Sequence, residues 1–269
     1  MAQASRHSLR QVALAALAIA DPQAKLAALG ALDDSLEAGA EAVLAQPEGL
    51  PGRPAKPELV PPQRLRKRAV HTPAGLAALI HSLAHIEFNA INLALDAVWR
   101  YAGMPAQYYR DWARVAREEG EHFGLLDAHL RGLGHEYGDF PAHDGLWEMA
   151  QRTRGDALAR MALVPRTLEA RGLDASPVVR SKLAAAGDAR GAAIVDIILR
   201  DEIGHVAVGN RWYRYLCEQQ GLDPHQNYQA LAAAYRAPCL HGPFNIEARR
   251  AAGFNDRELE ALQDDAVGI

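Results

Sequence analysis

The chain has 269 residues, 49% of them hydrophobic and 6% aromatic, and its formal net charge is −4 at pH 7. This length can bury a sizeable core in one large domain or two small ones. The slightly acidic balance argues against a general nucleic-acid binder, because surfaces that contact nucleic acids are usually strongly basic. The two cysteines give neither a disulfide framework nor the spacing of a zinc site. No uninterrupted apolar run approaches the roughly 20 residues that cross a bilayer, so no membrane association is expected.

Residues 1–70 are predicted to form a helical extension followed by a proline-rich strap. Residues 5–45 have the pattern of two Ala- and Leu-rich helices, with Asp21 as the N-cap of the second. The stretch RQVALAALAIADPQA resembles a signal peptide in its apolar run, but a helix break at Asp21 explains it better. A cytoplasmic location is therefore expected. Six prolines in residues 47–63 exclude a helix there.

An all-α fold is predicted, because the chain is rich in Ala, Leu and Arg and poor in β-branched runs. Helix-period patterns predict four long helices, over residues 72–103, 104–134, 144–172 and 188–220. Pro165 should kink the third, and a short further helix should begin at Ser176-Pro177. Four long helices with one longer connection in the middle are typical of a four-helix bundle. We expect that bundle over residues 71–221, with residues 222–269 as short helices packed on it in one structural domain.

Two of these helices carry the same pair of ionisable residues at positions that should be buried. Glu119 and His122 on the second helix are three residues apart, as are Glu202 and His205 on the fourth, so each pair lies on one helix face. Burying such groups among apolar residues without a compensating cation would be costly. One glutamate from each of the other two helices would complete an oxygen-rich set suited to two iron or manganese ions. The predicted ligands are Glu87, Glu119, His122, Glu169, Glu202 and His205.

The neighbouring acids Glu118 and Asp201 leave the register open, because each is spaced by four from the histidine on its helix. They could ligate in place of the glutamates one residue further on. We expect them instead to accept hydrogen bonds from the metal-bound imidazoles, Asp201 from His122 and Glu118 from His205. A ligating histidine usually donates its free N–H to a carboxylate in this way. Glu121 is expected at the surface.

These residues also have ordinary structural interpretations. A single Glu-x-x-His pair is usually a solvated helix face, and buried acids could pair with the many arginines instead of a metal. His81 and His85 lie near Glu87 in the sequence but should point away from it by helix spacing, so hydrogen-bonded structural roles are expected. Three tyrosines are interpreted as packing residues with hydrogen-bonded hydroxyls: Tyr109, Tyr213 and Tyr235.

Several segments resemble one protein family. HSLAHIEFNAINLALD (81–96), EEGEHFGLL (118–126), PRTLEARGLDASP (165–177) and DEIGHVAVGNRWY (201–213) are similar to the uncharacterised bacterial family catalogued as domain of unknown function 455 (DUF455), and the resemblance takes in nearly the whole chain. It implies a ferritin-like bundle with a two-metal centre, and it supports Glu169 as the ligand from the third helix. It implies no reaction. A more distant similarity, of fold and site alone, runs to ferritin-like tRNA-modifying hydroxylases, which oxidise a modified adenosine side chain.

The predicted function is that of an oxygen-activating oxidoreductase, in which a reduced metal pair binds dioxygen and oxidises a small-molecule or macromolecular substrate. Metal storage or detoxification and a structural metal site are the alternatives. The segments flanking the bundle argue against storage, because they would be awkward in the closed shell that storage needs. The substrate, the electron donor, the choice between iron and manganese and a homodimer all stay open. A tRNA substrate stays open as well, since RLRKR at 64–68 could contribute to a basic rim.

Overall fold

The protein is helical throughout the part that the structure describes. The computed structural model describes residues 7–66 and 68–267, and in these ranges the chain forms eleven α-helices, one short 3-10 helix and one π-helix. Strand pairing in the same ranges is limited to an isolated bridge between Leu59 and Ala142. The prediction of an all-α fold is therefore confirmed. Lys67, in the basic cluster at 64–68, lies outside the described residues.

The chain divides into two compact units, Met1–Asp144 and Gly145–Ile269. The boundary falls in the polar connection expected between the second and third long helices. Each unit contains helices of the predicted set, two in the first and two in the second. The expected bundle over residues 71–221, with a flanking segment on each side, stays a prediction.

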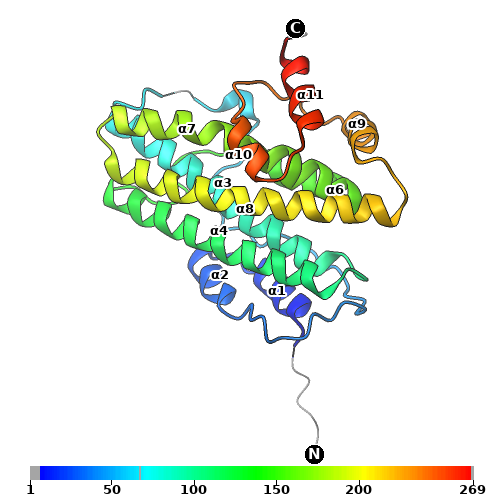
Figure 1. Ribbon diagram of the computed structural model, residues 1–269. Helices are drawn as coiled ribbons and strands as arrows, with labels where there is room; N and C mark the ends of the chain where they lie inside the picture. Colours follow the sequence, from blue (N-terminus) through cyan, green and yellow to red (C-terminus); the bar gives the residue numbers. More distant parts are fainter. Residues whose placement is uncertain (1–6, 67, 268–269) are drawn as a thin grey trace, which may run out of the picture. The chain divides into compact units, whose positions relative to one another are not determined.

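The core of the first unit is a pair of long helices, α3 (Pro73–Arg100) and α4 (Ala106–Gly132), which pack along one another (Figure 1). Thr72 caps α3 as predicted, since its Oγ1 accepts a hydrogen bond from the Gly75 N–H at 3.1 Å. By length and composition α3 could span a membrane, and 61% of its most apolar window is buried inside the protein. Such burial is what the core helix of a globular unit shows.

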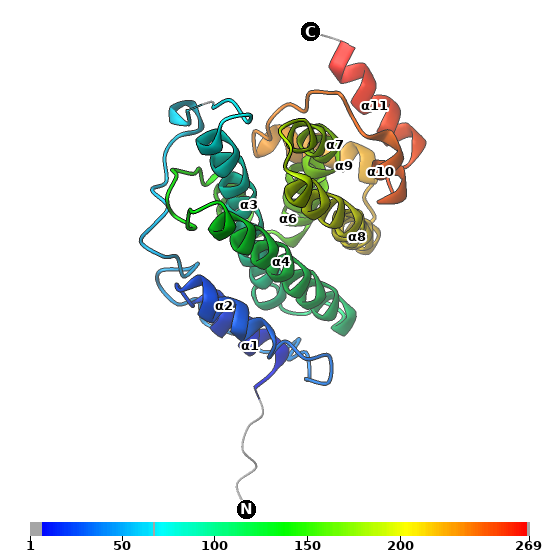
Figure 2. The same ribbon diagram turned by 90° about the vertical axis from the view of Figure 1, so that its left-hand side faces the viewer.

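Two short helices, α1 (Leu9–Leu17) and α2 (Pro22–Leu29), pack against this pair (Figure 2). Asp21 caps α2 as predicted, with its Oδ1 accepting a backbone N–H at 2.8 Å. The expectation of helix up to residue 45 is wrong, because α2 ends at Leu29. Shortly afterwards Oδ1 of Asp33 accepts the backbone N–H of Ser35 at 2.7 Å, a local turn that competes with helical hydrogen bonding.

The proline-rich segment that follows contains no α-helix and includes one short 3-10 turn, η1 (Pro62–Arg64). The exclusion of an α-helix from residues 47–63 is therefore confirmed. The Gly52 N–H donates to the Leu17 carbonyl at 2.8 Å. Arg53 forms an ion pair with Asp144, 2.6 Å between Nη2 and Oδ1. These two contacts connect the segment to α1 and to the last residue of the first unit.

A buried lysine joins α2, the proline-rich segment and α3. The ammonium of Lys25, which has no exposed surface, donates to the carbonyls of Leu17 and Gly52 at 3.2 Å each and to Oδ1 of Asn92. Burial lowers the pKa of Lys25 to about 7. Three acceptors around the nitrogen nevertheless favour the charged form, because an ammonium offers three N–H donors and a neutral amine only two.

The second unit is built around α8 (Ala189–Gln219), which begins where the sequence predicts the fourth long helix and has Asp188 as its N-cap. A broken line of helix consists of α5 (Gly145–Arg152), α6 (Ala157–Leu163), η2 (Val164–Glu169) and α7 (Ala170–Ala185). The last three of these pack on α8, and α5 packs on η2. The sequence predicts that the third helix is continuous and ends at Gly172, and both parts of this prediction are wrong. The helix is interrupted before Asp156, which caps α6, and it continues past Gly172 to the end of α7.

Two prolines lie inside this line. Pro165 is in η2, a π-helix, in which the backbone hydrogen bonds close a wider i→i+5 ring. Pro177 lies within α7, although the sequence predicts a new helix there. Proline removes the N–H that would bond to the carbonyl four residues earlier, here that of Leu173. The side-chain amide of Asn245 donates to this carbonyl at 3.2 Å instead, so the helix continues.

Pro165 packs directly on a glycine of α8. A Cβ placed on Gly209 would lie 2.5 Å from Cβ and 2.7 Å from Cγ of Pro165. Carbon atoms in contact normally lie about 3.5–4.0 Å apart, so only glycine allows η2 and α8 to approach this closely.

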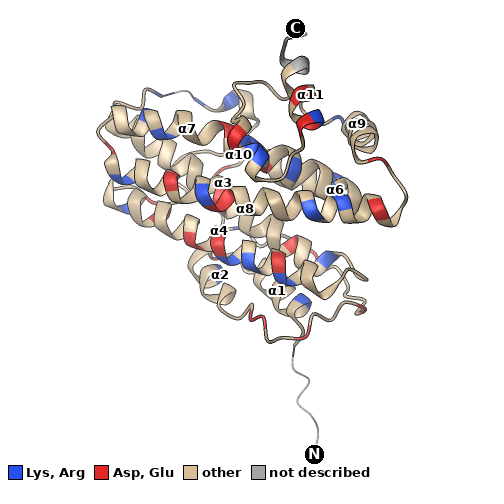
Figure 3. Cartoon of the chain, viewed as in Figure 1, with Lys and Arg blue, Asp and Glu red and all other residues tan. Residues whose placement is uncertain are grey.

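Three helices complete the second unit: α9 (Pro224–Ala234), α10 (Ile246–Ala251) and α11 (Asp256–Val267). The helix α9 packs on α6 and α8, whereas α10 packs on α7 and α8. The prediction of short helices after residue 222 is therefore confirmed. Arginines and acidic residues both occur along α4 and α8 (Figure 3), which is typical of the solvated faces of long helices.

Candidate metal centre

Three ionisable side chains meet inside the first unit. Glu87 comes from the middle of α3, and Glu119 and His122 lie one turn apart on α4. Their exposed fractions are 4%, 1% and 1%. Nδ1 of His122 lies 3.3 Å from Oε2 of Glu87 and 3.3 Å from Oε2 of Glu119. One imidazole nitrogen thus faces both carboxylates, and we refer to these three residues as the α3–α4 cluster.

Burial and mutual repulsion set the charges in this cluster. Burial raises the pKa of Glu87 well above its ordinary value, and the neighbouring Glu119 carboxylate raises it further. Burial would lower the pKa of His122, but hydrogen bonds with Glu119 and Glu87 outweigh it and raise this pKa to about 11. A protonated imidazole therefore lies between the two glutamate side chains. A divalent cation could replace that proton, with Nδ1 as its nitrogen ligand, because a ligating imidazole must be neutral.

Three aromatic rings pack together in the first unit. Phe88 and Phe123, each next in sequence to a member of the cluster, have ring centroids 5.4 Å apart, and both contact the ring of Tyr137. The Tyr137 hydroxyl lies 2.9 Å from Nδ1 of His85. Periodicity does not point to Tyr137, because it lies in the connection after α4, whose path a helical pattern does not predict.

His81 and His85 have hydrogen-bonded structural roles, as predicted. Nε2 of His81 accepts the Gly138 N–H at 2.9 Å, and Nε2 of His85 lies 3.1 Å from the His143 carbonyl oxygen. Burial lowers the pKa of each imidazole to about 4. Both histidines are therefore neutral at pH 7.

The second unit has the same pair of residues on α8. Glu202 and His205 have exposed fractions of 7% and 0%, and Nδ1 of His205 lies 3.7 Å from Oε1 of Glu202. The imidazole again turns Nδ1 toward the glutamate of its own helix. Glu169 is half-buried and ends η2, on the line of helix that packs against α8.

The structure brings together the three ligands predicted in the first unit, whose donor atoms lie within 4.8 Å of one another. Glu202 is a further buried carboxylate of the kind that could bind a metal ion. The complete six-residue ligand set, with Glu169 and His205 in it, stays a prediction.

The two neighbouring acids are partly exposed and pair with arginines of their own helices. Oε1 of Glu118 lies 3.4 Å from Nη1 of Arg114, and Oδ1 of Asp201 lies 2.8 Å from Nε of Arg200. Their hydrogen bonds to the ligating imidazoles stay a prediction. Glu121 is exposed, as predicted.

The interpretation of two tyrosines as packing residues is confirmed. Tyr109 and Tyr213 are fully buried. Their hydroxyls donate to the backbone carbonyls of Tyr101 at 2.8 Å and Pro224 at 2.6 Å. Tyr235 is only half-buried.

Fold and site together define an all-α protein with buried glutamates and a histidine that could bind metal. The chain belongs to the family described as "Protein of unknown function (DUF455)", which matches residues 18–260. It is 48% identical over 263 residues to an uncharacterized protein of Haemophilus influenzae, an alignment that covers 93% of this chain and 91% of that protein. No solved structure matches the chain. The resemblance to DUF455 is therefore confirmed.

Proposed function

We propose that this DUF455 protein is a ferritin-like oxidoreductase, with a carboxylate-bridged centre of two metal ions that activates oxygen. The ions would be iron, manganese or one of each. The helices α3, α4 and α8 and the line from α6 to α7 would form a four-helix bundle around it. Its ligands would be Glu87, Glu119, His122, Glu169, Glu202 and His205.

The observation that carries the proposal is a repeated arrangement of donor atoms. In each unit a Glu-x-x-His pair is buried on a long helix, and in each pair Nδ1 of the histidine faces the glutamate, at 3.3 Å for His122 and 3.7 Å for His205. In the α3–α4 cluster the hydrogen bonds of His122 join two carboxylates to one imidazole, which are ligand types that iron and manganese accept. Four glutamates with two histidines would balance the charge of two dications.

The chain's own residues would fix the number and orientation of the ligands and keep water out. When bound, reduced iron or manganese would supply the electrons that dioxygen chemistry requires. Glu87, Glu119 and His122 are buried, and burial strengthens electrostatic interactions among them. Glu169 would be presented by the π-helix η2, and π-helical turns occur frequently at functional sites.

The first experiment measures metal content. Elemental analysis of the purified protein should find about two ions of iron or manganese per chain. Glu119→Ala and Glu202→Ala should each halve or abolish that content. Glu121→Ala is the matched control, since Glu121 lies on the same helix as Glu119 but is exposed, and it should retain all the metal.

Two further variants test the register. Glu118→Ala and Asp201→Ala should lose less metal than the changes one residue further on. If these two variants lose more metal, Glu118 and Asp201 are the ligands in place of the glutamates one residue further on. A parent protein that takes up neither metal would refute the proposal.

The second experiment tests reactivity. Iron-loaded protein, reduced under nitrogen and mixed with oxygen, should show a transient visible absorption and consume oxygen in proportion to two irons per chain. Continued uptake of many irons into a large assembly would instead indicate storage. A reduced centre that is inert to oxygen, and whose removal only lowers the melting temperature, would indicate a structural site.

A further inference from the structure

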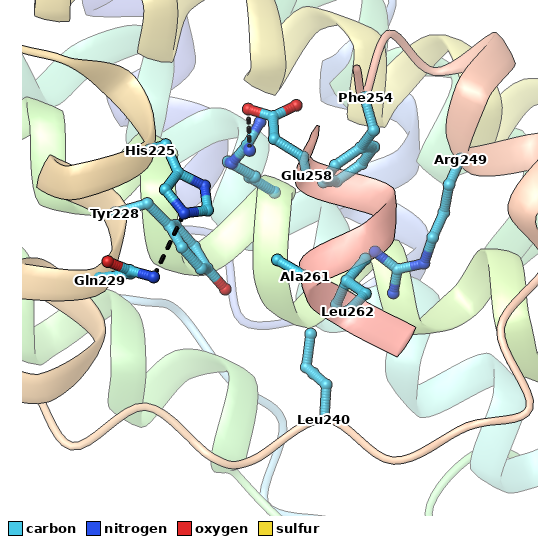
Figure 4. Close-up of a pocket in the computed structure, with 10 residues that line it drawn as sticks. His225, Tyr228, Gln229, Leu240, Arg249, Phe254, Glu258, Ala261 and Leu262 are labelled. Carbon is cyan, nitrogen blue, oxygen red and sulfur yellow. Dashed lines mark hydrogen bonds and ion pairs between the residues drawn. The ribbon is translucent and has the colours of Figure 1, made fainter. Parts of the chain in front are cut away.

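A pocket of about 60 Å³ lies within the second unit, among η2, α9, α10 and α11. Figure 4 shows its lining, in which the side chains of Tyr228, Phe254 and Leu262 surround the hollow and the guanidinium of Arg249 reaches in from α10 toward Leu262. Arg166, from the π-helix η2, also lines it. The pocket therefore combines aromatic and aliphatic walls with two cationic groups.

Both arginines are buried, with exposed fractions of 3% for Arg166 and 0% for Arg249. Nη2 of Arg166 lies 2.5 Å from Oε1 of Glu258, whereas Arg249 binds Asp174 through Nε at 2.9 Å and Nη2 at 2.6 Å. Each keeps one buried nitrogen, Nε of Arg166 and Nη1 of Arg249, that makes no hydrogen bond to any described residue. Buried donors of this kind normally have a partner.

The two guanidinium groups approach one aromatic ring. The Cζ atoms of Arg166 and Arg249 lie 4.7 Å and 5.3 Å from the ring centroid of Phe254. At these distances the guanidinium groups make cation–π contacts with the ring, which help to hold both side chains in place.

Charge around the pocket does not balance. Arg166 and Arg214 both bind Glu258, and Arg249 binds Asp174. The buried pairs Arg166–Glu258 and Arg249–Asp174 balance each other, and Arg214, whose side chain is 38% exposed, brings one further positive charge to this group. A ligand with a single negative charge would neutralise it.

We propose that this pocket binds the carboxylate of a small aliphatic acid, with Arg166 and Arg249 as its donors. A carboxylate carries one charge and two oxygens, which match the excess charge and the two unused N–H groups. The volume of about 60 Å³ is less than half of the roughly 150 Å³ cavity that holds benzene, so the acid is short. Its alkyl part would contact Leu240 and Leu262.

Calorimetric titration of the full chain with sodium propionate at constant ionic strength tests the proposal. Propionamide, which has the same shape and no charge, should bind at least about tenfold more weakly, because charge-assisted hydrogen bonds are the stronger ones. Inorganic phosphate is the third probe. Equal binding of propionate and propionamide, or binding of phosphate alone, would overturn the assignment.

Two variants locate the binding. Arg249→Met should weaken propionate binding at least about tenfold, whereas Arg250→Met, at an exposed arginine of the same helix, should leave it unchanged. Because Arg249→Met also breaks an ion pair, Ala261→Leu is the second variant. Its larger side chain should fill the pocket and prevent propionate binding without removing a charge. Propionate binding that survives Ala261→Leu in a folded protein would place the site elsewhere.

Discussion

Replacing Gly209 by alanine should destabilise the second unit, although alanine favours helices. The new Cβ would lie 2.5 Å from Cβ of Pro165, at least about 1 Å inside the normal contact distance. The proline ring cannot rotate away, because its φ angle is fixed, so the backbone of η2 must move. Overpacking of this kind costs about 1–3 kcal/mol, and the helix propensity of alanine returns up to about 1 kcal/mol. The difference is a net loss of up to about 2 kcal/mol.

Gly204→Ala is the matched control on the same helix. A Cβ on Gly204 would have no described atom within 4 Å, so this variant should gain up to about 1 kcal/mol from propensity alone. Urea unfolding followed by circular dichroism compares the two, and amide hydrogen exchange should show faster exchange in residues 164–169 of Gly209→Ala. Equal stability of the two variants would refute the close packing of Pro165 on α8.

Three further predictions concern other sites. Acidification from pH 6.5 to 4 should destabilise the protein, because folding lowers the pKa values of His81 and His85 and the unfolded chain therefore binds protons at a higher pH. The variant His85→Asn should reduce the slope of the unfolding free energy against pH by the equivalent of up to about one proton. Lys25→Met should cost about 2–4 kcal/mol in urea unfolding, since three buried acceptors lose their donor. Asp156→Ala should lower the unfolding free energy by about 1 kcal/mol, because it removes the side-chain acceptor for the Ala159 N–H at the start of α6.

Three helix starts were predictable at positions where a side chain caps the helix. Thr72, Asp21 and Asp188 each accept a backbone N–H there, whereas the cap at Asp156 was missed. A further error arose where a distant contact overrides a local rule. Pro177 stays inside α7 because Asn245, far along the chain, supplies the hydrogen bond that proline cannot make.

The candidate site was predictable to the extent that helical spacing determines it. The i, i+3 rule puts Glu119 and His122 on one face, and the apolar neighbours of that face indicate burial. Spacing cannot say which nitrogen of His122 faces the carboxylates, nor that the hydroxyl of Tyr137 lies beside His85. Both depend on how a loop or a second helix packs, which no local pattern encodes.

The π-helix has a consequence for how the sequence can change over time. A π turn takes up one residue more than an α-helical turn, so η2 sets the rotational phase of α7 relative to α6. Deleting one residue there would turn everything after it by about 100°. Ala170 and Leu173 would leave the buried side of α7, and Glu169 would turn with them. We therefore expect substitutions in residues 164–169 to be tolerated far better than insertions or deletions, which would change the length of the segment and with it the direction of every later side chain.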